Sequence, residues 1–156
     1  MPNTWYLGFF QSITENCSFE EVAERLKLIT LIVFNYDRCI EYFLIEALKV
    51  FYGKNNEEVE KLLTKLTIIH PYGMLAELSS TDSQKGYQFG ETLFEDDLVK
   101  CSSNIKTFTE GMSDDSLIQN QIHDAILNVE QLVLIGFAFH ELNMKLLTPP
   151  PKPHQD

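Results

Sequence analysis

Apolar positions along the chain recur mainly in alternating steps of three and four residues. From Val22 onward, apolar or small side chains occupy positions 22, 26, 29, 33, 36, 40, 43, 47 and 50. This spacing keeps one stripe of a helix against a neighbour, and many flanking positions are apolar too. The pattern predicts a central helix at about residues 20–52, covered on most sides by other helices. Gly53 is expected to end it, because glycine accepts the left-handed conformation that follows many helices.

Two short motifs indicate where helices begin. In Ser18 with Glu21, and again in Asn55 with Glu58, each side chain can bond the backbone N–H of the other residue. Both pairs have the spacing of a capping box, so we expect helices to start directly after Ser18 and after Asn55. Pro71 is expected to stop the second of these helices.

The rest of the chain adds helical segments and few signals for strands. Little period-two alternation is present, and no Asn-Gly or Asp-Gly turn indicates a hairpin. Further helices are expected over residues 4–15, 91–109 and 115–147, the last packed beside the central helix. The predicted fold is all-α: a single-domain bundle of five or six helices over residues 1–147, with a Pro-rich flexible tail at 148–156.

The composition is that of an ordinary globular protein. Hydrophobic residues make up 44% of the 156 residues, and charged residues 22%. No apolar run approaches the roughly 20 residues that cross a bilayer, and the N-terminus lacks the basic start of a secretory signal. The three cysteines form no Cys-x-x-Cys pair, so neither a disulfide framework nor a zinc site is expected. We therefore expect a cytoplasmic protein that needs no cofactor and binds no membrane.

Negative charge is concentrated in one part of the sequence. Residues 91–130 carry nine acids against Lys100 and Lys106, and they hold −7 of the net charge of −11. A field of this sign repels nucleic acids and attracts basic proteins. The expected function is that of a small acidic protein-binding inhibitor, such as an immunity protein that neutralises a basic, nuclease-type bacterial toxin. The oligomeric state stays open.

Acidic side chains near expected helix starts are the candidate contacts for such a partner. The helix dipole favours carboxylates there, but it does not require a net charge as large as this one. The candidate partner-binding residues are Glu95, Asp96, Asp97, Asp114 and Asp115, with the polar loop at 79–90 beside them.

A second group of polar residues interrupts the most apolar part of the chain. The stretch FNYDRCIEYFLIEALKVFYG, residues 34–53, contains Asn35, Asp37, Arg38 and Glu41. Arg38 and Glu41 are three residues apart and can form an ion pair along a helix surface. In this interpretation, the polar part of the helix reaches solvent or holds an ion pair within the protein. Alternatively, the four side chains form a polar pocket between helices that binds a small ligand. The sequence leaves both interpretations open.

The same stretch resembles the Asp-Arg-bearing helix of the MtlR (mannitol-operon repressor-like) family, in which an Asp-Arg pair precedes a helical turn rich in Leu and Glu. The resemblance covers about 20 residues. It implies an all-helical fold and a regulatory or adaptor protein that binds its partner through an apolar groove. It carries over no catalytic residue.

The residue spacings that common catalytic sites need are absent. His70, His123 and His140 belong to no Glu-x-x-His or His-Glu-x-x-His motif, and no Gly-x-Ser-x-Gly or Gly-rich phosphate loop occurs. We therefore expect a binding protein and not an enzyme.

Overall fold

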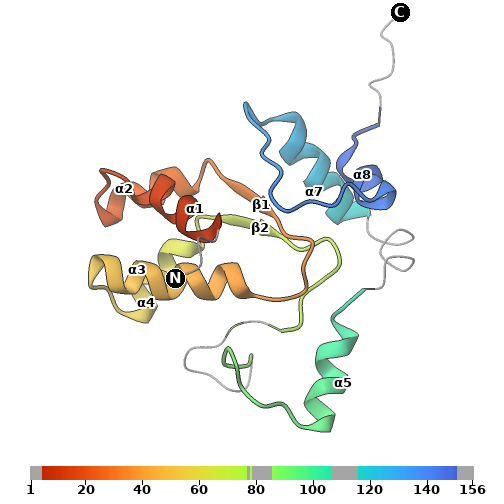
Figure 1. Cartoon of the computed structure of the whole chain (residues 1–156), viewed down its shortest axis with the longest axis horizontal. Coiled ribbons are helices and arrows are strands. Elements are labelled where there is room, and N and C mark those ends of the chain that lie inside the picture. The colour runs from red at the N-terminus through yellow and green to blue at the C-terminus, as the bar shows by residue number, and fades with distance from the viewer. Residues whose placement is uncertain (1–4, 77, 79–85, 107–115, 151–156) are drawn as a thin grey trace, which may run out of the picture.

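A computed structural model describes residues 5–76, 78, 86–106 and 116–150 of the chain. These residues form a predominantly helical structure with one small parallel sheet (Figure 1). The helices are α1 (Trp5–Thr14), α2 (Phe19–Leu26), α3 (Cys39–Tyr52), α4 (Asn56–Leu63), α5 (Glu95–Ser103), α7 (Ser116–Leu127) and α8 (Glu141–Leu147), and the strands are β1 (Thr30–Ile32) and β2 (Thr67–Ile69). The predominance of helices is confirmed, but the fold is not purely all-α.

The two strands form a parallel pair joined by helices. The register places Thr30 opposite Thr67, Leu31 opposite Ile68 and Ile32 opposite Ile69. Since α3 and α4 both lie between the strands in the chain, the order β1–α3–α4–β2 is the helical crossover that parallel pairing requires. The prediction of a purely helical bundle missed this unit because neither strand shows period-two alternation.

The prediction of one central helix over residues 20–52 is wrong. Instead, α2 and α3 are separate helices with β1 between them. The apolar run from Leu31 to Phe34 does not alternate, which is typical of a parallel strand buried on both faces and also compatible with a buried helix. The Asp37 carboxylate accepts a hydrogen bond from the Cys39 backbone N–H at 3.0 Å, where α3 begins. Gly53 ends α3 with a φ of 64°, as predicted.

The other long helices are shorter than predicted, whereas the first helix, α1, is confirmed. Residues 128–140 form no regular structure and divide the expected helix at 115–147 into α7 and α8. Within residues 91–106, the described part of the expected helix at 91–109, the helix that forms is α5. The helix after Asn55 ends at Leu63 and is followed by β2, so Pro71 is not its stop.

Both capping boxes are present as predicted. The Ser18 N–H donates to the Glu21 carboxylate at 2.8 Å, and the Glu21 N–H donates to the Ser18 hydroxyl at 3.3 Å. Asn55 and Glu58 make the same two bonds at 3.1 and 2.9 Å. The bonds from the backbone N–H groups lower the pKa of both glutamates below the usual value. Local sequence therefore determines where α2 and α4 begin.

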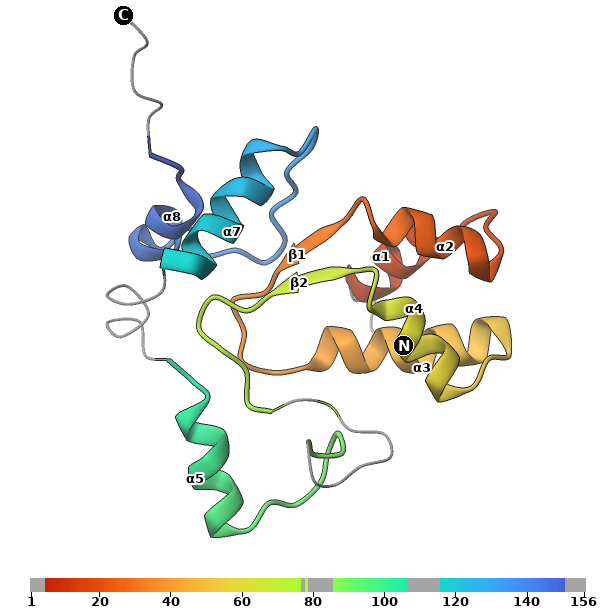
Figure 2. The ribbon, with the colours of Figure 1, turned by 180° about the vertical axis from the view of Figure 1, so that it is seen from behind.

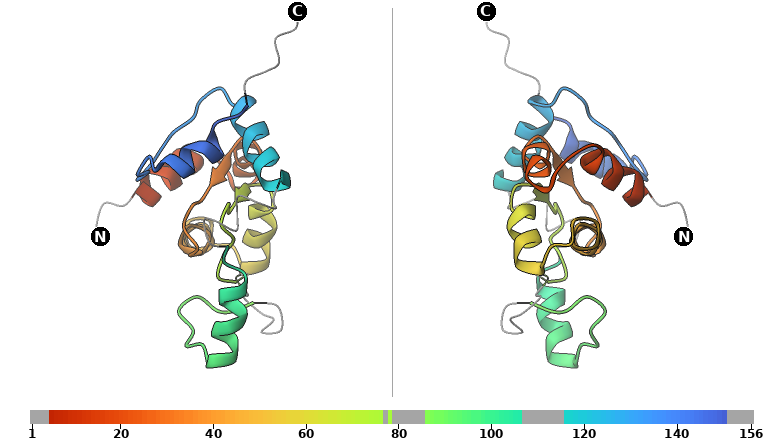
Figure 3. Two further views of the ribbon diagram at one scale, coloured as in Figure 1. Left: turned by 90° about the vertical axis from the view of Figure 1, so that its right-hand side faces the viewer. Right: turned by 90° about the vertical axis from the view of Figure 1, so that its left-hand side faces the viewer.

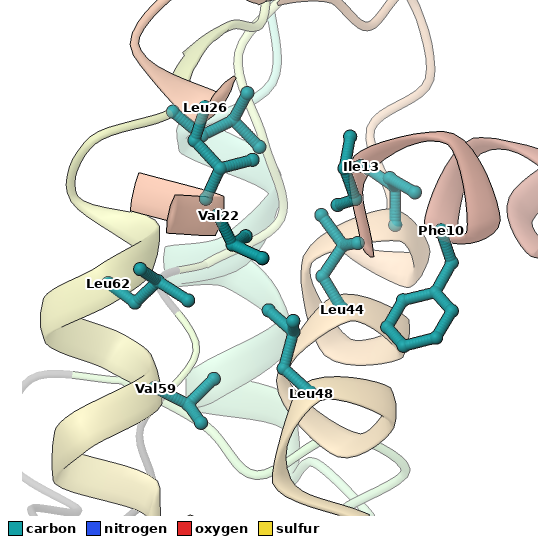
Figure 4. Packing of buried hydrophobic residues seen from close by; sticks show 10 residues of the cluster. Phe10, Ile13, Val22, Leu26, Leu44, Leu48, Val59 and Leu62 are labelled. Carbon is teal, nitrogen blue, oxygen red and sulfur yellow. The ribbon is translucent and has the colours of Figure 1, made fainter. Parts of the chain in front are cut away.

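Alternate side chains of β1 pack on opposite faces of the sheet. Leu31 and Val33 join the main core, whereas Ile32 and Phe34 join a smaller one. The main core buries Phe10, Ile13, Val22, Leu26, Ile40, Leu44, Leu48, Val59, Leu62 and Leu66, and the small core buries Ile69, Ile122 and Leu147. Figure 4 shows side chains of α1, α2, α3 and α4 pointing toward one another in the main core. The sheet is therefore covered on both faces.

The whole arrangement is layered. The helices α1 to α4 lie on one side of the strands, and α7 and α8 lie on the other (Figures 1 and 2). The helix α5 is set apart from both layers (Figure 3). None of the described helices combines the length and the apolar character that a bilayer crossing needs. Residues 151–156 of the predicted Pro-rich tail lie outside the described residues.

Candidate functional site

Two loops meet at one end of the small sheet. The loop after β1 contains Asn35, Tyr36 and Asp37, and the segment after β2 begins at His70. Because the strands are parallel, their carboxyl ends lie at the same end of the sheet. The two segments also bond directly, since the Leu75 backbone N–H donates to the Tyr36 carbonyl at 3.0 Å. In open α/β sheets, ligands bind outside the carboxyl ends of the strands.

A buried ion cluster of Arg38, Glu41 and His70 ties these segments to the first turn of α3. Arg38 Nε donates to Glu41 Oε1 at 2.7 Å, and His70 Nε2 lies 2.8 Å from the same oxygen. Arg38 Nη1 also donates to the Ala76 carbonyl at 3.0 Å. The side chains of Arg38, Glu41 and His70 are only 19%, 7% and 4% exposed. The cluster is therefore held by short bonds largely away from solvent.

The ring of His70 bridges the two segments. Its Nδ1 lies 3.3 Å from the Asn35 carbonyl, while Nε2 faces the Glu41 carboxylate, so both neighbours are hydrogen-bond acceptors. A neutral imidazole can donate only one of these bonds, whereas the imidazolium donates both. In either form the ring therefore connects the segment after β2 to the loop after β1 or to the first turn of α3.

Glu41 is ionised although it is buried. Burial is the largest influence on its pKa and raises it, but the hydrogen bond from His70 and the charge of Arg38 together outweigh that effect. The pKa of Glu41 therefore lies below the usual range. Its second oxygen, Oε2, is buried and receives no hydrogen bond from any residue that the structure describes. A donor that reached Oε2 would stabilise the site, because an unbonded buried carboxylate oxygen is costly.

Asp37 and Cys39 form the neighbouring part of the site. Burial raises the pKa of Asp37, but hydrogen bonds from the thiol and N–H of Cys39 and from the Asn35 side chain lower it below its usual value. Burial, together with the Asp37 hydrogen bond, raises the pKa of Cys39 to about 11, so the thiol keeps its proton at neutral pH. The result is a fixed, ionised Asp37 beside an unreactive thiol.

The four residues predicted to line a polar pocket, Asn35, Asp37, Arg38 and Glu41, lie together at this end of the sheet. Asn35 is exposed and Asp37 half-buried, whereas the ion pair between Arg38 and Glu41 lies beneath them. That they bind a ligand stays a prediction. Sequence reasoning missed His70, although its position directly after the apolar triplet of β2 would have placed it at a strand end.

The predicted acidic contacts are partly brought together on α5. Glu95, Asp96 and Asp97 form its first turn. Asp97 accepts hydrogen bonds from the Tyr87 hydroxyl at 2.8 Å and from Lys100 at 3.3 Å, and the bond from Tyr87 is the largest cause of its lowered pKa. Glu95 and Asp96 take part in no ion pair among the described residues.

The remaining acids of this segment are either elsewhere or not described. Asp114 and Asp115 lie outside the described residues, and so do positions 79–85 of the predicted loop. Asp124 belongs to α7, which Figure 1 shows well apart from α5. The described acids therefore lie on separate elements, and the predicted contacts that the structure describes are the three on α5.

The described residues offer no metal site, and no known relative indicates what the candidate site does. Among the described residues, no group of three or more His, Cys, Asp or Glu side chains is placed to hold a metal ion. The chain matches no protein-family model, no curated protein and no solved structure. The resemblance of residues 34–53 to the MtlR family stays a prediction, and Asp37 and Arg38 precede α3 rather than lying inside it.

Proposed function

We propose that the protein binds a small polar ligand, rich in hydroxyl groups, outside the carboxyl ends of β1 and β2. The observation that carries this proposal is the meeting of the polar loop after β1 with the segment after β2, next to the buried cluster of Arg38, Glu41 and His70. Stability alone does not account for the cluster, because apolar side chains of similar volume often stabilise a core as well or better. Shifted carboxyl pKa values at a strand end are typical of binding sites.

The accessible part of the site determines the chemistry of the ligand. The ionised carboxylate of Asp37 is half-buried, with Asn35 and Tyr36 exposed beside it. Carboxylate and amide oxygens accept hydrogen bonds, while the Asn35 amide and the Tyr36 hydroxyl can also donate them. Adjacent hydroxyl groups, as in a sugar, polyol or nucleoside, match this mixture. An anionic group at the same place would be repelled by Asp37.

Calorimetric titration with a panel of monosaccharides, polyols and nucleosides tests this function. At least one compound is expected to bind saturably to the full chain. Asp37→Asn is expected to weaken that binding about tenfold or more, because a hydrogen bond to a charged group contributes about 1.5–3 kcal/mol. The failure of every compound to bind would contradict the proposal.

An exposed aspartate on α7 provides the matched control. Asp124 lines, with Thr30 and all three residues of β2, a hollow of about 430 Å³. Asp124→Asn removes the same charge as Asp37→Asn but is expected to leave the affinity unchanged. Equal weakening by both variants would mean that net charge, and not the proposed site, controls binding.

A second candidate function, protein binding through α5, is supported by a different observation. The helix stands apart from both layers (Figure 3), and Phe94 at its N-cap and Leu98 and Val99 within it are 78%, 54% and 69% exposed. Glu95 and Asp96 are exposed beside them. An apolar patch next to unpaired carboxylates suits a basic protein partner, as for an acidic inhibitor such as a toxin immunity protein.

Charge reversal tests this second function. Glu95→Lys/Asp96→Lys is expected to abolish salt-sensitive capture of a basic protein from host cells, identified by mass spectrometry and then titrated as a purified protein. The control, Glu20→Lys/Glu57→Lys, changes the net charge equally in the first turns of α2 and α4 and is expected to retain the partner. Equal capture by the two variants would contradict binding through α5.

A further inference from the structure

The first helix, α1, exposes apolar side chains on its outer side. Whereas Phe10 and Ile13 of this helix are buried in the main core, Trp5 and Leu7 are 42% and 41% exposed. The helix lies at the outer side of its layer (Figure 3). Exposed aromatic and aliphatic side chains are typical of surfaces that contact other proteins. The exposed residues of α1, which we name the α1 face, are Trp5, Leu7, Gly8, Gln11 and Ser12.

The α1 face is uncharged in a strongly acidic protein. The chain has a net charge of −11, and every other described helix contains at least one acid, whereas α1 contains neither acids nor bases. The charged group bonded to the backbone of this face is basic, since Arg25 Nη1 donates to the Ser12 carbonyl at 2.9 Å. Two copies of such a chain repel each other where acids meet, over roughly 8 Å at physiological salt. The α1 face avoids this repulsion and therefore suits a second, equally acidic copy.

Gly8 lies in the middle of the face, and nothing in the described part of the chain requires a glycine there. Its backbone is helical, and a Cβ at this position would meet no other part of the described chain within 4 Å. Glycine destabilises the interior of a helix relative to alanine. What glycine permits is the close approach of another backbone, because packed helix axes come nearer when the side chains between them are small. Gly8 thus fits a contact with a helix outside this chain.

We propose that two copies of the chain associate through the α1 face, with their α1 helices crossing at Gly8. A two-fold axis brings Trp5 and Leu7 of both copies together around the crossing, so that each face covers the other. Buried aromatic side chains contribute much of the binding energy at such contacts. A membrane fits less well, because helices that lie in membrane surfaces are rich in Lys and Arg and α1 has none. The inference does not depend on the proposed ligand or on binding through α5.

Sedimentation equilibrium of the full chain over about a hundredfold range of concentration tests the association. A reversible dimer is expected. Trp5 is the only tryptophan of the chain, so its fluorescence should shift to shorter wavelength as the dimer forms. A monomer at every concentration would overturn the proposal, as would a monomer that binds phosphatidylcholine vesicles, since a lipid surface would then cover the face. A dimer that leaves the fluorescence unchanged would show that the copies meet elsewhere.

Truncations on two helices make the test specific to the α1 face. Trp5→Ala is expected to raise the dissociation constant of the dimer about tenfold or more, because it removes the largest side chain of the contact. Leu117→Ala is the control, since it removes a 66% exposed apolar side chain from α7, on the other side of the strands (Figure 1). The control is expected to leave the dimer unchanged. Equal weakening by both variants would contradict the assignment of the interface to α1.

Gly8→Ala separates association from folding. Alanine favours the helix, so the urea midpoint of the variant should rise in dilute solution, where the monomer predominates. The added Cβ keeps the two helices apart, so the dissociation constant of the dimer should rise about tenfold or more. A higher midpoint with an unchanged dimer would mean that the helices do not cross at Gly8, and the proposal would then be wrong.

Discussion

At the scale of single residues, the Glu41 carboxylate provides the negative charge that pairs with Arg38 in the candidate site. One of its oxygens accepts hydrogen bonds from both Arg38 and His70, so removal of this carboxylate leaves Arg38 without its counter-charge and His70 Nε2 without its acceptor. Breaking a buried pair by removing one partner costs about 3–5 kcal/mol, whereas replacing a whole pair by apolar groups is often neutral. Replacing one charged residue of the cluster should therefore lower the stability of the protein more than replacing the whole cluster by apolar residues.

Glu41→Gln is accordingly expected to lower the free energy of unfolding by about 3 kcal/mol at pH 7, because Arg38 is then buried beside a neutral amide. Urea denaturation of the variant and the unaltered protein measures the difference. Glu46→Gln on the same helix is the control, since the Glu46 side chain is 45% exposed in its pair with Lys49. This control should change stability by less than about 1 kcal/mol. Similar losses in the two variants would contradict the role of Glu41.

The same carboxylate predicts a dependence of stability on pH. The pKa of Glu41 in the folded protein lies below its ordinary value of about 4.3, so the unfolded chain binds the proton more readily. Its contribution to stability is complete above that ordinary value and is lost as the pH falls through the lowered folded value. Urea midpoints measured below about pH 4.3 should therefore fall more steeply for the unaltered protein than for Glu41→Gln. Equal slopes would show that other carboxylates account for the dependence.

At the scale of elements, local signals predicted where helices begin better than where they end. The capping boxes at Ser18 and Asn55 were readable because each signature lies within four residues. The strand β1 was missed because the short apolar run from Leu31 to Phe34 has the same pattern as a buried helical segment. What distinguishes the two is pairing with β2, a contact between distant parts of the chain that no local pattern contains.

The candidate site was likewise predictable only in part. Asn35, Asp37, Arg38 and Glu41 stood out as polar residues in an apolar stretch, and the close spacing of Arg38 and Glu41 indicated their ion pair. His70 lacked such a signal, because only the parallel alignment of β1 and β2 carries it to Glu41. A prediction of the strands would thus have predicted the rest of the site.

A substitution at the start of α2 tests how much one capping box contributes. Ser18→Ala removes the hydroxyl that accepts the Glu21 N–H and is expected to lower the free energy of unfolding by about 1 kcal/mol. Ser102→Ala is the control: this serine is exposed inside α5, and its hydroxyl donates to the carbonyl of Val99 three residues earlier. The control is expected to change stability by less than about 0.5 kcal/mol in the same urea titration. A loss at Ser102 as large as that at Ser18 would contradict a specific effect of the cap.

At the scale of the whole molecule, the two cores differ in size. The main core joins four helices through a large set of buried apolar residues, whereas the small core buries only Ile69, Ile122 and Leu147 among the described residues. Elements with fewer buried contacts open at lower free energy than the rest of a protein. The helices α7 and α8 are therefore expected to unfold locally while α1 to α4 remain folded.

Matched truncations in the two cores test this uneven stability. Ile122→Ala removes a fully buried side chain of α7 and is expected to speed amide exchange in α7 and α8 at least about tenfold, with α3 unchanged. Leu48→Ala is expected to speed exchange throughout, because it opens a cavity between α3 and its neighbours. Leu117→Ala is the surface control on α7, since Leu117 is 66% exposed. Faster exchange of α3 in Ile122→Ala, equal to that of α7, would show that both cores unfold as one unit.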